Sequence, residues 1–474
     1  MSVAIFWFRQ DLRCHDNPAL TLACSSHKKI IPLYIKDPTP ALTIGGAQQW
    51  WLHHSLQSLK EDLNTHQLDL NLRQANPLNL LKALIKEHQV DAVYWNRCYE
   101  PMHIARDQQI KTELRALGVE VVSCNGSLLQ EPWEVLNQSG SYFKVFTPYW
   151  RQCLRQLQVK PPVHIDNWPS NHPITSDTLE AWDLLPTKPN WAKEFSVFWQ
   201  PGEAGAMANL HDFIDFHLQD YKELRNEPGK PGTSRLSPHL HFGEISPQQI
   251  WEAVHIAMQD PKCNQQSAQT FLAELGWREF SYQLLYHYPE LMDTNFKRQF
   301  DQFAWHDDPA ALALWQKGLT GYPIVDAGMR ELWRTGYMHN RVRMIVASFL
   351  TKHLLIDWRR GAEWFWDTLV DADLANNSAS WQWVAGSGAD ASPYYRIFNP
   401  VVQGEKFDPH GHYTRQWVPE LAKVPDKWLH KPWEAPSGAL GLTLGKEYPL
   451  PLVDHATARE RALSNYKQLS QEHD

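Results

Sequence analysis

The first 125 residues alternate between two hydrophobic periods, and this alternation constrains the fold more than any other feature of the chain. Helical patterns, such as the one over Trp50–Leu63, separate short apolar runs that are typical of buried strands. Strands that alternate with helices form a parallel sheet covered by helices. We therefore predict a five-stranded, Rossmann-like α/β domain with strands at Val3–Phe8, Ile30–Ile35, Leu68–Leu72, Val90–Trp95 and Val119–Ser123.

The rest of the chain has a different character. Residues 131–198 are rich in Pro, Asn and Ser, which predicts a long ordered linker after an α/β domain at residues 1–130. Helical patterns dominate from about Gly205, so residues 199–474 are expected to form a large all-α domain. The loop after the first strand, FRQDLRCHDNPAL, lacks the G-x-G-x-x-G signature, which argues against a dinucleotide in the usual Rossmann position.

Charge and cysteine usage exclude several classes of protein. The net charge of −8 argues against a globally basic nucleic-acid binder, although a local basic groove is compatible with it. The six cysteines and 23 histidines are dispersed without metal-ligand spacing, so no metal site is predicted. Because charge appears by Arg9 and no apolar run is long enough to cross a membrane, we expect neither a signal peptide nor a membrane span, and a soluble, cytoplasmic chain.

The stretch PGTSRLSP, at Pro231–Pro238, is a candidate phosphate site. Arg235 lies among the hydroxyl side chains of Thr233, Ser234 and Ser237. Ser237 followed by proline is a favourable N-cap and first helical residue, and a helix N-terminus with hydroxyls nearby suits an anion. On the motif alone, a plain capped loop without a ligand is the favoured alternative.

The stretch ELGWRE, at Glu274–Glu279, carries a second candidate site. On a helix, Glu274, Trp277 and Arg278 share one face because they lie three and four residues apart. A carboxyl, an indole and a guanidinium on one stripe could bind a planar polar ligand. A surface ion pair beside a packed tryptophan explains the pattern about as well.

The stretch Tyr337–Leu355 is predicted to be a helix that becomes apolar after Arg343. Asn340, Arg343 and Met344 share one face of it. An arginine at the edge of an apolar helix requires a carboxylate, because an unpaired buried charge is expensive. The natural partners are Asp371 and Asp373. Such a pair suits a structural role as well as a ligand site.

The segment Asp371–Trp383, DADLANNSASWQW, places polar side chains within apolar sequence. Asn, Asp and Ser favour turns and caps over helix interiors, and polar groups in an apolar setting must be satisfied. A polar cofactor would satisfy these groups. Trp381 and Trp383 are two residues apart and point to different sides of any regular element, so one could contact a cofactor and the other a pocket. Taken alone, Trp305 and Trp358 are core residues.

Six motifs in the same order make the chain resemble the photolyase/cryptochrome flavoproteins along nearly its whole length. They are FRQDLRCHDNPAL, TSRLSP, GYPIVDAGMREL, MHNRVRMIVASFL, DADLANNSASWQW and RIFNPVVQGEKFD. Within this family the chain is similar to the class I photolyases that repair cyclobutane pyrimidine dimers. The resemblance implies an antenna-binding α/β domain, a linker, and a helical domain that binds FAD and DNA.

The resemblance implies one FAD per chain, active in its reduced anionic form. Asn377 matches the amide that faces flavin N5. Arg343 and Asp371 match a pair beside the flavin ring, and Asp373 a residue near the ribityl chain and ring. The remaining positions that match FAD contacts of the family are Tyr221, Thr233, Ser234, Arg235, Leu236 and Ser237.

The resemblance also assigns residues to ultraviolet-damaged DNA, single- or double-stranded, and to electron transfer. Glu274 matches the residue that hydrogen-bonds a thymine of the flipped-out dimer. The other positions that match lesion or DNA contacts are Arg225, Trp277, Asn340, Arg341, Met344, Trp383 and Gln403. The electron-transfer chain from flavin to surface matches Trp381, Trp358 and Trp305. The chain is expected to act as a monomer.

A few positions bear on the subfamily and the antenna. Asn377 stands where plant-type cryptochromes carry Asp, and Asn340 and Met344 stand where six-four photolyases carry histidines. Repair of cyclobutane dimers is therefore favoured over a cryptochrome-like photoreceptor or a six-four photolyase. Met102 and His103 depart from the Asn-Glu pair of folate-binding relatives, so the antenna stays open among methenyltetrahydrofolate, a deazaflavin, another flavin or an empty groove. A tryptophan-rich module for planar ligands or sugars, which would carry no flavin, is the third alternative.

Overall fold

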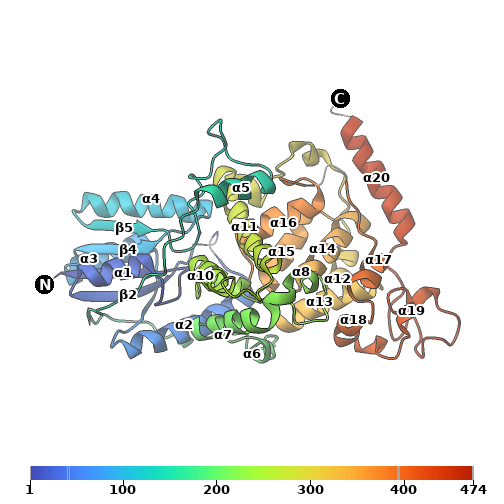
Figure 1. Cartoon of the computed structure of the whole chain (residues 1–474), viewed down its shortest axis with the longest axis horizontal. Helices are drawn as coiled ribbons and strands as arrows, with labels where there is room; N and C mark the ends of the chain where they lie inside the picture. The colour runs from blue at the N-terminus through green and yellow to red at the C-terminus, as the bar shows by residue number, and fades with distance from the viewer. Residues whose placement is uncertain (1, 40, 42, 392–394, 472–474) are drawn as a thin grey trace. The chain divides into compact units, whose positions relative to one another are not determined.

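The computed structural model describes residues 2–39, 41, 43–391 and 395–471 (Figure 1). Its residues separate into two compact units. Unit 1 comprises Met1–Gln219, Ser234–Pro289 and Val370–Asp373, and unit 2 comprises Asp220–Thr233, Glu290–Leu369 and Leu374–Asp474. Each unit therefore draws on three separate stretches of the chain.

A parallel sheet forms the first part of unit 1, with its strands in the order β3-β2-β1-β4-β5. The strands are β1 (Val3–Phe8), β2 (Lys29–Lys36), β3 (Asn71–Gln74), β4 (Ala92–Asn96) and β5 (Glu120–Cys124). The α/β prediction is confirmed, and each of these strands lies within a few residues of its predicted place. The predicted count of five is corrected by β6 (Ser170–Asn171), which pairs with β2. A strand of two residues is too short to show a hydrophobic period, so β6 cannot be predicted from the sequence pattern.

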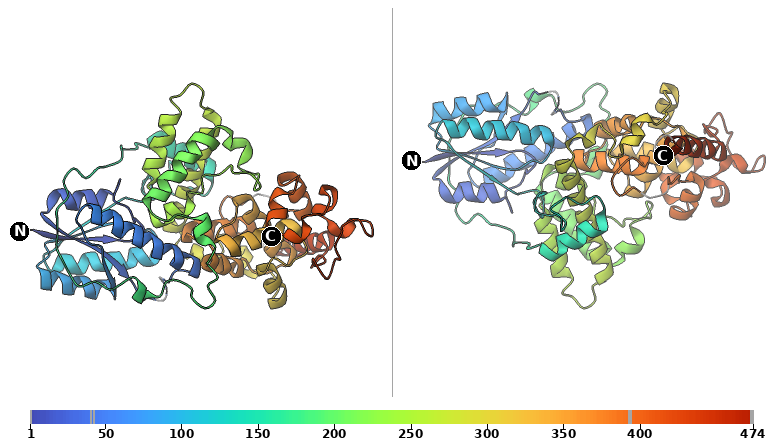
Figure 2. Two further views of the ribbon diagram at one scale, coloured as in Figure 1. Left: turned by 90° about the horizontal axis from the view of Figure 1, so that it is seen from below. Right: turned by 90° about the horizontal axis from the view of Figure 1, so that it is seen from above.

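Helices lie on both faces of this sheet (Figure 2). They are α1 (Pro18–Ser26), α2 (Gly46–Thr65), α3 (Pro77–His88) and α4 (Pro101–Ala116). The core between them is apolar; Ile5, Trp7 and Val93 from the strands are buried with Leu81 and Leu114 from the helices. Burial on both faces explains why the strands read as nearly continuous apolar runs.

The remaining helices of unit 1 follow the sheet in the chain. They are α5 (Phe146–Gln156), α6 (Phe195–Phe198), α7 (Glu203–Asp212), α9 (Ser237–Phe242), α10 (Pro247–Ala257) and α11 (Gln265–His287). The side chain of Asn264 caps the first turn of α11 by accepting hydrogen bonds from two backbone amides. The long α11 packs on α5, and this pair later supplies part of the candidate site.

Unit 2 is largely helical, as predicted. Its helices are α8 (Tyr221–Leu224), α12 (Pro309–Gln316), α13 (Pro323–Thr335), α14 (Asn340–Ser348), α15 (Trp358–Thr368), α16 (Leu374–Ala385), α17 (Pro400–Phe407), α18 (His412–Trp417), α19 (Asp426–Leu429) and α20 (His455–Gln471). The helix predicted over Tyr337–Leu355 begins later, at Asn340, and continues after Ser348 as a π-helix at Phe349–His353. Among the described residues, no helix combines the length and apolar character needed to cross a bilayer.

The segment that reads as turn-forming is mostly a helix. α16 covers Leu374–Ala385 although its sequence is rich in Asn and Ser. Tertiary bonds override the weak propensity: the buried amide nitrogen of Gln382 donates to the carbonyl oxygens of Leu291 at 2.7 Å and Thr294 at 2.9 Å. The helix is therefore fixed by its partners in unit 2 rather than by its own residue preferences.

Candidate functional site

Asp371, just before α16, is held in unit 1 by a serine hydroxyl. Oγ of Ser237 donates a hydrogen bond of 2.6 Å to Oδ2 of Asp371, which is 7% exposed. A buried carboxylate needs such a donor. The predicted N-cap role of Ser237 is wrong, because α9 begins at Ser237 and Leu236 occupies the N-cap position without a side-chain bond. The predicted pairing of Asp371 with Arg343 stays a prediction.

Asp373 has two partners that the sequence reading did not select. The hydroxyl of Tyr282 on α11 donates to Oδ2 of Asp373, and Nδ1 of His241 lies 3.6 Å from the same oxygen. Burial acts to raise the pKa of Asp373, but His241 and the tyrosine outweigh it, so the pKa lies below its ordinary value. The carboxylate is ionised at neutral pH. Tyr282 lies one turn after Arg278, and this helical spacing is the signal that could have found it.

The TSRL stretch has an irregular backbone that its surroundings fix. The φ of Arg235 is +54°, in the left-handed region that costs a non-glycine residue about 1 kcal/mol. The guanidinium carbon of Arg235 lies 4.2 Å from the ring centroid of Trp199, and Leu236 is buried. Thr233 and Ser234 are half-buried. The structure thus presents polar side chains along a strained turn, and their contact with FAD phosphates stays a prediction.

α11 carries Glu274, Trp277 and Arg278 on one helix, as predicted. The ring of Trp277 stacks on Phe146 of α5 with centroids 3.7 Å apart and planes 9° apart, and it remains 37% exposed. Nη1 of Arg278 donates a 2.7 Å hydrogen bond to the carbonyl oxygen of Ser127. The arginine therefore ties α11 to a loop of unit 1, while the tryptophan offers a supported aromatic surface beside Glu274.

Glu279 is a buried acid on the same helix that the sequence reading passed over. Its Oε2 accepts hydrogen bonds from the backbone amides of Leu129 at 2.9 Å and Gln130 at 3.2 Å. Burial nevertheless dominates and raises the pKa of Glu279 to about 7. Trp277 is exposed and Glu279 is buried, although both belong to the ELGWRE stretch. Spacing along a helix does not by itself reveal this difference.

A cluster of cationic side chains surrounds His339 in unit 2. The backbone amide of Arg341 donates to Nδ1 of His339 at 3.2 Å, so this nitrogen carries no proton. Burial, followed by the charges of Arg343, Arg341 and Arg225, lowers the pKa of His339 to about 3. The guanidinium of Arg341 also donates to Oδ1 of Asn226 at 2.7 Å. The arginines predicted to contact DNA or flavin therefore gather around one neutral imidazole.

The other predicted positions of unit 2 differ in exposure. Arg343 donates from Nε to the carbonyl oxygen of Met338 at 2.7 Å, and Arg225 lies 5.6 Å over the buried ring of Tyr221. Asn340 is exposed. Two half-buried side chains complete this set, those of Met344 and Gln403.

The predicted electron-transfer tryptophans are packed to different degrees. Trp381 on α16 is 2% exposed, and a Cβ added to Gly361 of α15 would lie 2.1 Å from its ring, so only glycine allows this approach. Trp358 is fully buried, with Nε1 donating to Oδ1 of Asn295 at 2.9 Å. The half-buried Trp305 has its ring centroid 4.5 Å from that of Phe303. The order from buried to half-buried suits a path toward the surface.

Trp383 and Asn377 also lie on α16, and each donates a hydrogen bond to a backbone carbonyl oxygen. Nε1 of Trp383 donates to the carbonyl oxygen of Asp390 at 3.0 Å, and Nδ2 of Asn377 donates to that of Ala362 at 3.1 Å. Trp383 also lines a small cavity together with Lys352, whose buried ammonium donates to the carbonyl oxygen of Ala385 at 2.6 Å. The different burial of Trp381 and Trp383 agrees with the prediction that they face different sides.

The chemistry of these side chains fits FAD. The hydroxyls and guanidinium of the TSRL stretch can donate to phosphates, and in unit 1 the buried carboxylates of Asp371 and Asp373 can accept from ribityl hydroxyls. In unit 2, Nε2 of His339 is buried and lacks a hydrogen-bond partner among the residues the structure describes. A polar group supplied by a ligand would satisfy that nitrogen.

Comparisons with known proteins bear on the whole chain. Two family models match it: "DNA photolyase" over residues 4–168 and "FAD binding domain of DNA photolyase" over residues 271–468. The deoxyribodipyrimidine photo-lyase of Agrobacterium fabrum is 52% identical over 98% of this chain and 97% of its own length. Cryptochrome-2 of Arabidopsis thaliana is 38% identical over 96% of this chain and 77% of its own length.

A solved structure agrees with these sequence matches. A bacterial class III photolyase from Agrobacterium tumefaciens superimposes with a TM-score of 0.96 at 50% sequence identity. The superposition covers 99% of this chain and 98% of that protein. The match thus extends over both units.

Proposed function

The chain belongs to the DNA photolyase family, and on that premise we propose that it uses light to split cyclobutane pyrimidine dimers in DNA. The observation that carries the proposal is the exposed face of Trp277, stacked on Phe146 one helical turn from Glu274. A rigid aromatic surface beside a carboxyl suits a pair of joined pyrimidine rings taken out of the duplex.

The lesion pocket is proposed to work by packing and hydrogen bonding. Trp277 would pack against one ring face of the dimer and exclude water, which strengthens the polar contacts that remain. Glu274 would hydrogen-bond a thymine, and its position three residues before Trp277 allows both contacts from one helix. Asn340, Met344 and Trp383 are the other residues proposed to contact the lesion. Asn340 and Met344 offer no imidazole acid or base, which favours cyclobutane dimers over six-four products.

FAD is the proposed cofactor, held through the residues whose chemistry fits it. The TSRL stretch and Ser237 would bind its phosphates, together with Tyr221, and Asp371, Asp373 and Arg343 would bind the ribityl chain and ring. Asn377 would hydrogen-bond near flavin N5. When bound, reduced and excited by light, the flavin supplies the electron that cleaves the dimer. Burial of Asp371 and Asp373 keeps water away from these contacts.

Trp381, Trp358 and Trp305 are proposed to pass electrons to bound oxidised flavin. We expect Trp381→Phe to lose photoreduction of oxidised FAD while repair by chemically pre-reduced protein persists, because only the supply of electrons is cut. Trp333→Phe is the matched control, since Trp333 is 50% exposed and stacks on Trp364 elsewhere in unit 2. Unchanged photoreduction in Trp381→Phe would refute the proposed path.

The decisive experiment is a repair assay on ultraviolet-treated oligonucleotide. Reduced protein under blue light should remove cyclobutane dimers, and a dark sample should not. No repair above the dark sample would overturn the proposal. The same oligonucleotide carrying six-four products tests that alternative activity, and we expect no repair of them.

A cryptochrome-like photoreceptor is the second candidate, favoured by the identity with plant Cryptochrome-2. It predicts flavin photoreduction without repair. Asn377, rather than the aspartate of plant-type cryptochromes, counts against it. If repair is absent but photoreduction intact, this second function replaces the first.

The proposal also concerns the photolyase subclass and the antenna chromophore. The match to a class III photolyase over 99% of the chain favours class III over the class I assignment expected from the motifs. A methenyltetrahydrofolate or deazaflavin antenna would bind in the α/β part of unit 1. Extraction of chromophores from the purified protein, followed by absorption and mass spectra, distinguishes these from a chain that carries FAD alone. Size-exclusion chromatography with light scattering tests the expected monomer.

A further inference from the structure

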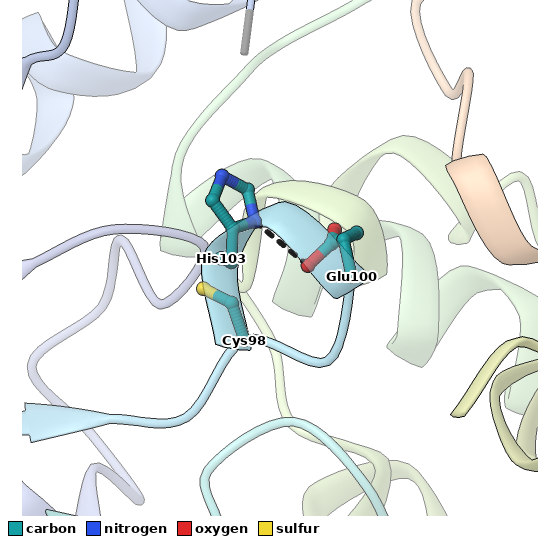
Figure 3. A group of neighbouring side chains, drawn as sticks. All are labelled: Cys98, Glu100 and His103. Carbon is teal, nitrogen blue, oxygen red and sulfur yellow. Dashed lines mark hydrogen bonds and ion pairs between the residues drawn. The ribbon is translucent and has the colours of Figure 1, made fainter. Parts of the chain in front are cut away.

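Three donor side chains of different chemistry meet where β4 ends and α4 begins. They are the thiol of Cys98, the carboxylate of Glu100 and the imidazole of His103, and their ligand atoms all lie within 4.8 Å of one another (Figure 3). Cys98 is 6% exposed and Glu100 is 4% exposed, and His103 is half-buried. Cys98 and Glu100 have no role in the function proposed above, and His103 stands where folate-binding relatives carry an antenna contact.

The local fold explains how six consecutive residues bring these donors together. Pro101 begins α4, which leaves Glu100 at the N-cap position, but its carboxylate makes no capping bond. Instead Oε2 of Glu100 lies 2.9 Å from Nδ1 of His103, one turn into the helix. Oε1 of Glu100 accepts a 2.7 Å hydrogen bond from Nε2 of Gln10. The carboxylate is thus turned away from the helix end and toward the imidazole.

We propose that Cys98, Glu100 and His103 bind one zinc ion. Sulfur, nitrogen and carboxylate oxygen are the ligands that Zn²⁺ takes in tetrahedral sites, whereas Mg²⁺ and Ca²⁺ prefer oxygen alone. A water molecule would fill the fourth position. On binding, the thiol loses its proton to solvent, so thiolate and carboxylate together neutralise the charge of the ion.

The surroundings suit this neutral complex. The two arginines whose charges act on Cys98 already have carboxylate partners, since Arg9 pairs with Asp107 and Arg106 with Asp37 at 3.3 Å. Gln10 would hold Glu100 from the far side, as partners of metal ligands commonly do. Ligand atoms around zinc lie roughly 3.5 Å apart, given bonds of about 2.0–2.3 Å. The ligand atoms must therefore approach one another by about an ångström, and rotation of the half-buried His103 side chain would supply that movement.

The sequence analysis predicts no metal site because the chain lacks paired cysteines. That criterion does not detect the C-x-E-x-x-H spacing at residues 98–103. The rival explanation is a Glu100–His103 ion pair beside an inert buried thiol. The two differ in one measurable respect, because an ion pair has no need of Cys98.

Cobalt(II) titration of the metal-stripped, full-length protein with its flavin bound tests the proposal. We expect one equivalent of Co²⁺ to produce d–d bands beyond the absorption of oxidised flavin and a sulfur-to-cobalt charge-transfer band, and Zn²⁺ to abolish both. Cys98→Ser and His103→Asn should each weaken binding by more than 10-fold. Gln10→Ala, which acts only through Glu100, should weaken binding about 10-fold.

The matched control is Cys24→Ser, since Cys24 is equally buried, on α1, and is not part of the group. It should bind Co²⁺ like the unaltered chain. His103→Asn guards against misfolding of the cysteine variant because His103 is partly exposed, and circular dichroism verifies the fold of each. Absence of saturable binding at one equivalent, or equal binding by Cys98→Ser and the unaltered chain, would overturn the proposal. Neither result depends on DNA repair.

Discussion

Around their candidate site residues, the two compact units bury ionisable groups of opposite kind. On α11 of unit 1, the buried group is an acid, Glu279, whose pKa is raised to about 7 by burial. Beside α14 of unit 2, it is a base, His339, whose pKa is lowered to about 3 by burial and three arginines. Both groups are therefore pushed toward their neutral forms, but pH acts on them in opposite directions.

In each unit a tryptophan ring packs closely against a helical glycine, but the two rings differ in how deeply they are buried. In unit 1, a Cβ added to Gly276 would lie 2.6 Å from the ring of the half-buried Trp150. In unit 2, a Cβ on Gly361 would lie 2.1 Å from the buried ring of Trp381. One unit leaves this tryptophan partly exposed, and the other encloses it.

The largest expected effect concerns His339. Its folded pKa is about 3 and its ordinary value 6.5, so below pH 6.5 the unfolded chain takes up a proton that the native chain refuses. Stability is complete above pH 6.5 and falls by about 4 kcal/mol as pH drops toward 3. His339→Asn keeps an N-cap acceptor and should remove this loss, measured as the difference in urea unfolding free energy between pH 7 and pH 4.

The control for His339 is the exposed His306 in the same unit. His306→Asn should leave the acid-dependent loss intact. If His339→Asn and the unaltered chain lost the same unfolding free energy in acid, His339 would not be the cause of the acid sensitivity. The proposed difference between the two units would then be wrong for unit 2.

The next effect concerns Glu279 and has the opposite sign. Between pH 4.5 and 7 the native chain holds a proton that the unfolded chain releases, so stability falls as pH rises through this window, by about 3 kcal/mol. Glu279→Gln should abolish the fall and make the variant more stable than the unaltered chain at pH 8. Urea unfolding at pH 5 and pH 8 measures it, with the exposed Glu61→Gln on α2 as control. A fall that persists in Glu279→Gln contradicts the assignment.

The glycines give a smaller, steric test of the same contrast. Gly361→Ala should destabilise unit 2 by about 1–3 kcal/mol, because the buried ring of Trp381 has no room to move. Gly276→Ala should destabilise unit 1 less, since Trp150 is only half-buried and alanine favours the helix by about 1 kcal/mol. Thermal unfolding followed by near-ultraviolet circular dichroism compares them, and equal effects would remove the distinction between enclosed and presented tryptophan.

The smallest expected effect is on DNA binding. Arg341→Ala should lower the salt dependence of DNA affinity by about one unit of slope, because one phosphate contact is lost. Arg278→Ala should leave the slope unchanged, since Arg278 donates to the carbonyl oxygen of Ser127. Fluorescence anisotropy of a damaged oligonucleotide across a salt series measures both. If only Arg278→Ala changed the slope, the phosphate contact would belong to Arg278 of unit 1, and the prediction for Arg341 of unit 2 would be wrong.

The parts of the fold that follow from local pattern could be predicted, and the parts that depend on distant partners could not. The strands at Val3–Phe8 and its neighbours are buried on both faces, so their apolar runs identify them. α16 was read as turn-forming because the bonds of Gln382 to a distant loop leave no mark on local sequence. The same limit hid Tyr282 as the partner of Asp373.

The candidate site shows the same division. Helical spacing identified Glu274, Trp277 and Arg278 together, but it did not distinguish the exposed tryptophan from the buried Glu279 two residues later. The hydroxyl of Ser237 was expected to cap a helix and instead serves Asp371. Residue types at a site can thus be read from motifs, whereas the assignment of each hydrogen bond requires the tertiary fold.

The interleaving of the two units along the chain has a consequence for how the protein is made. Ser237 must wait for Asp371, which is synthesised 134 residues later, and Tyr282 waits 91 residues for Asp373. At typical rates of elongation the first delay is on the order of ten seconds, long compared with the folding of a helix. Unit 1 therefore cannot be completed before about half of unit 2 has been synthesised, and a nascent chain stopped at Leu369 would contain Ser237 and Tyr282 without their carboxylate partners.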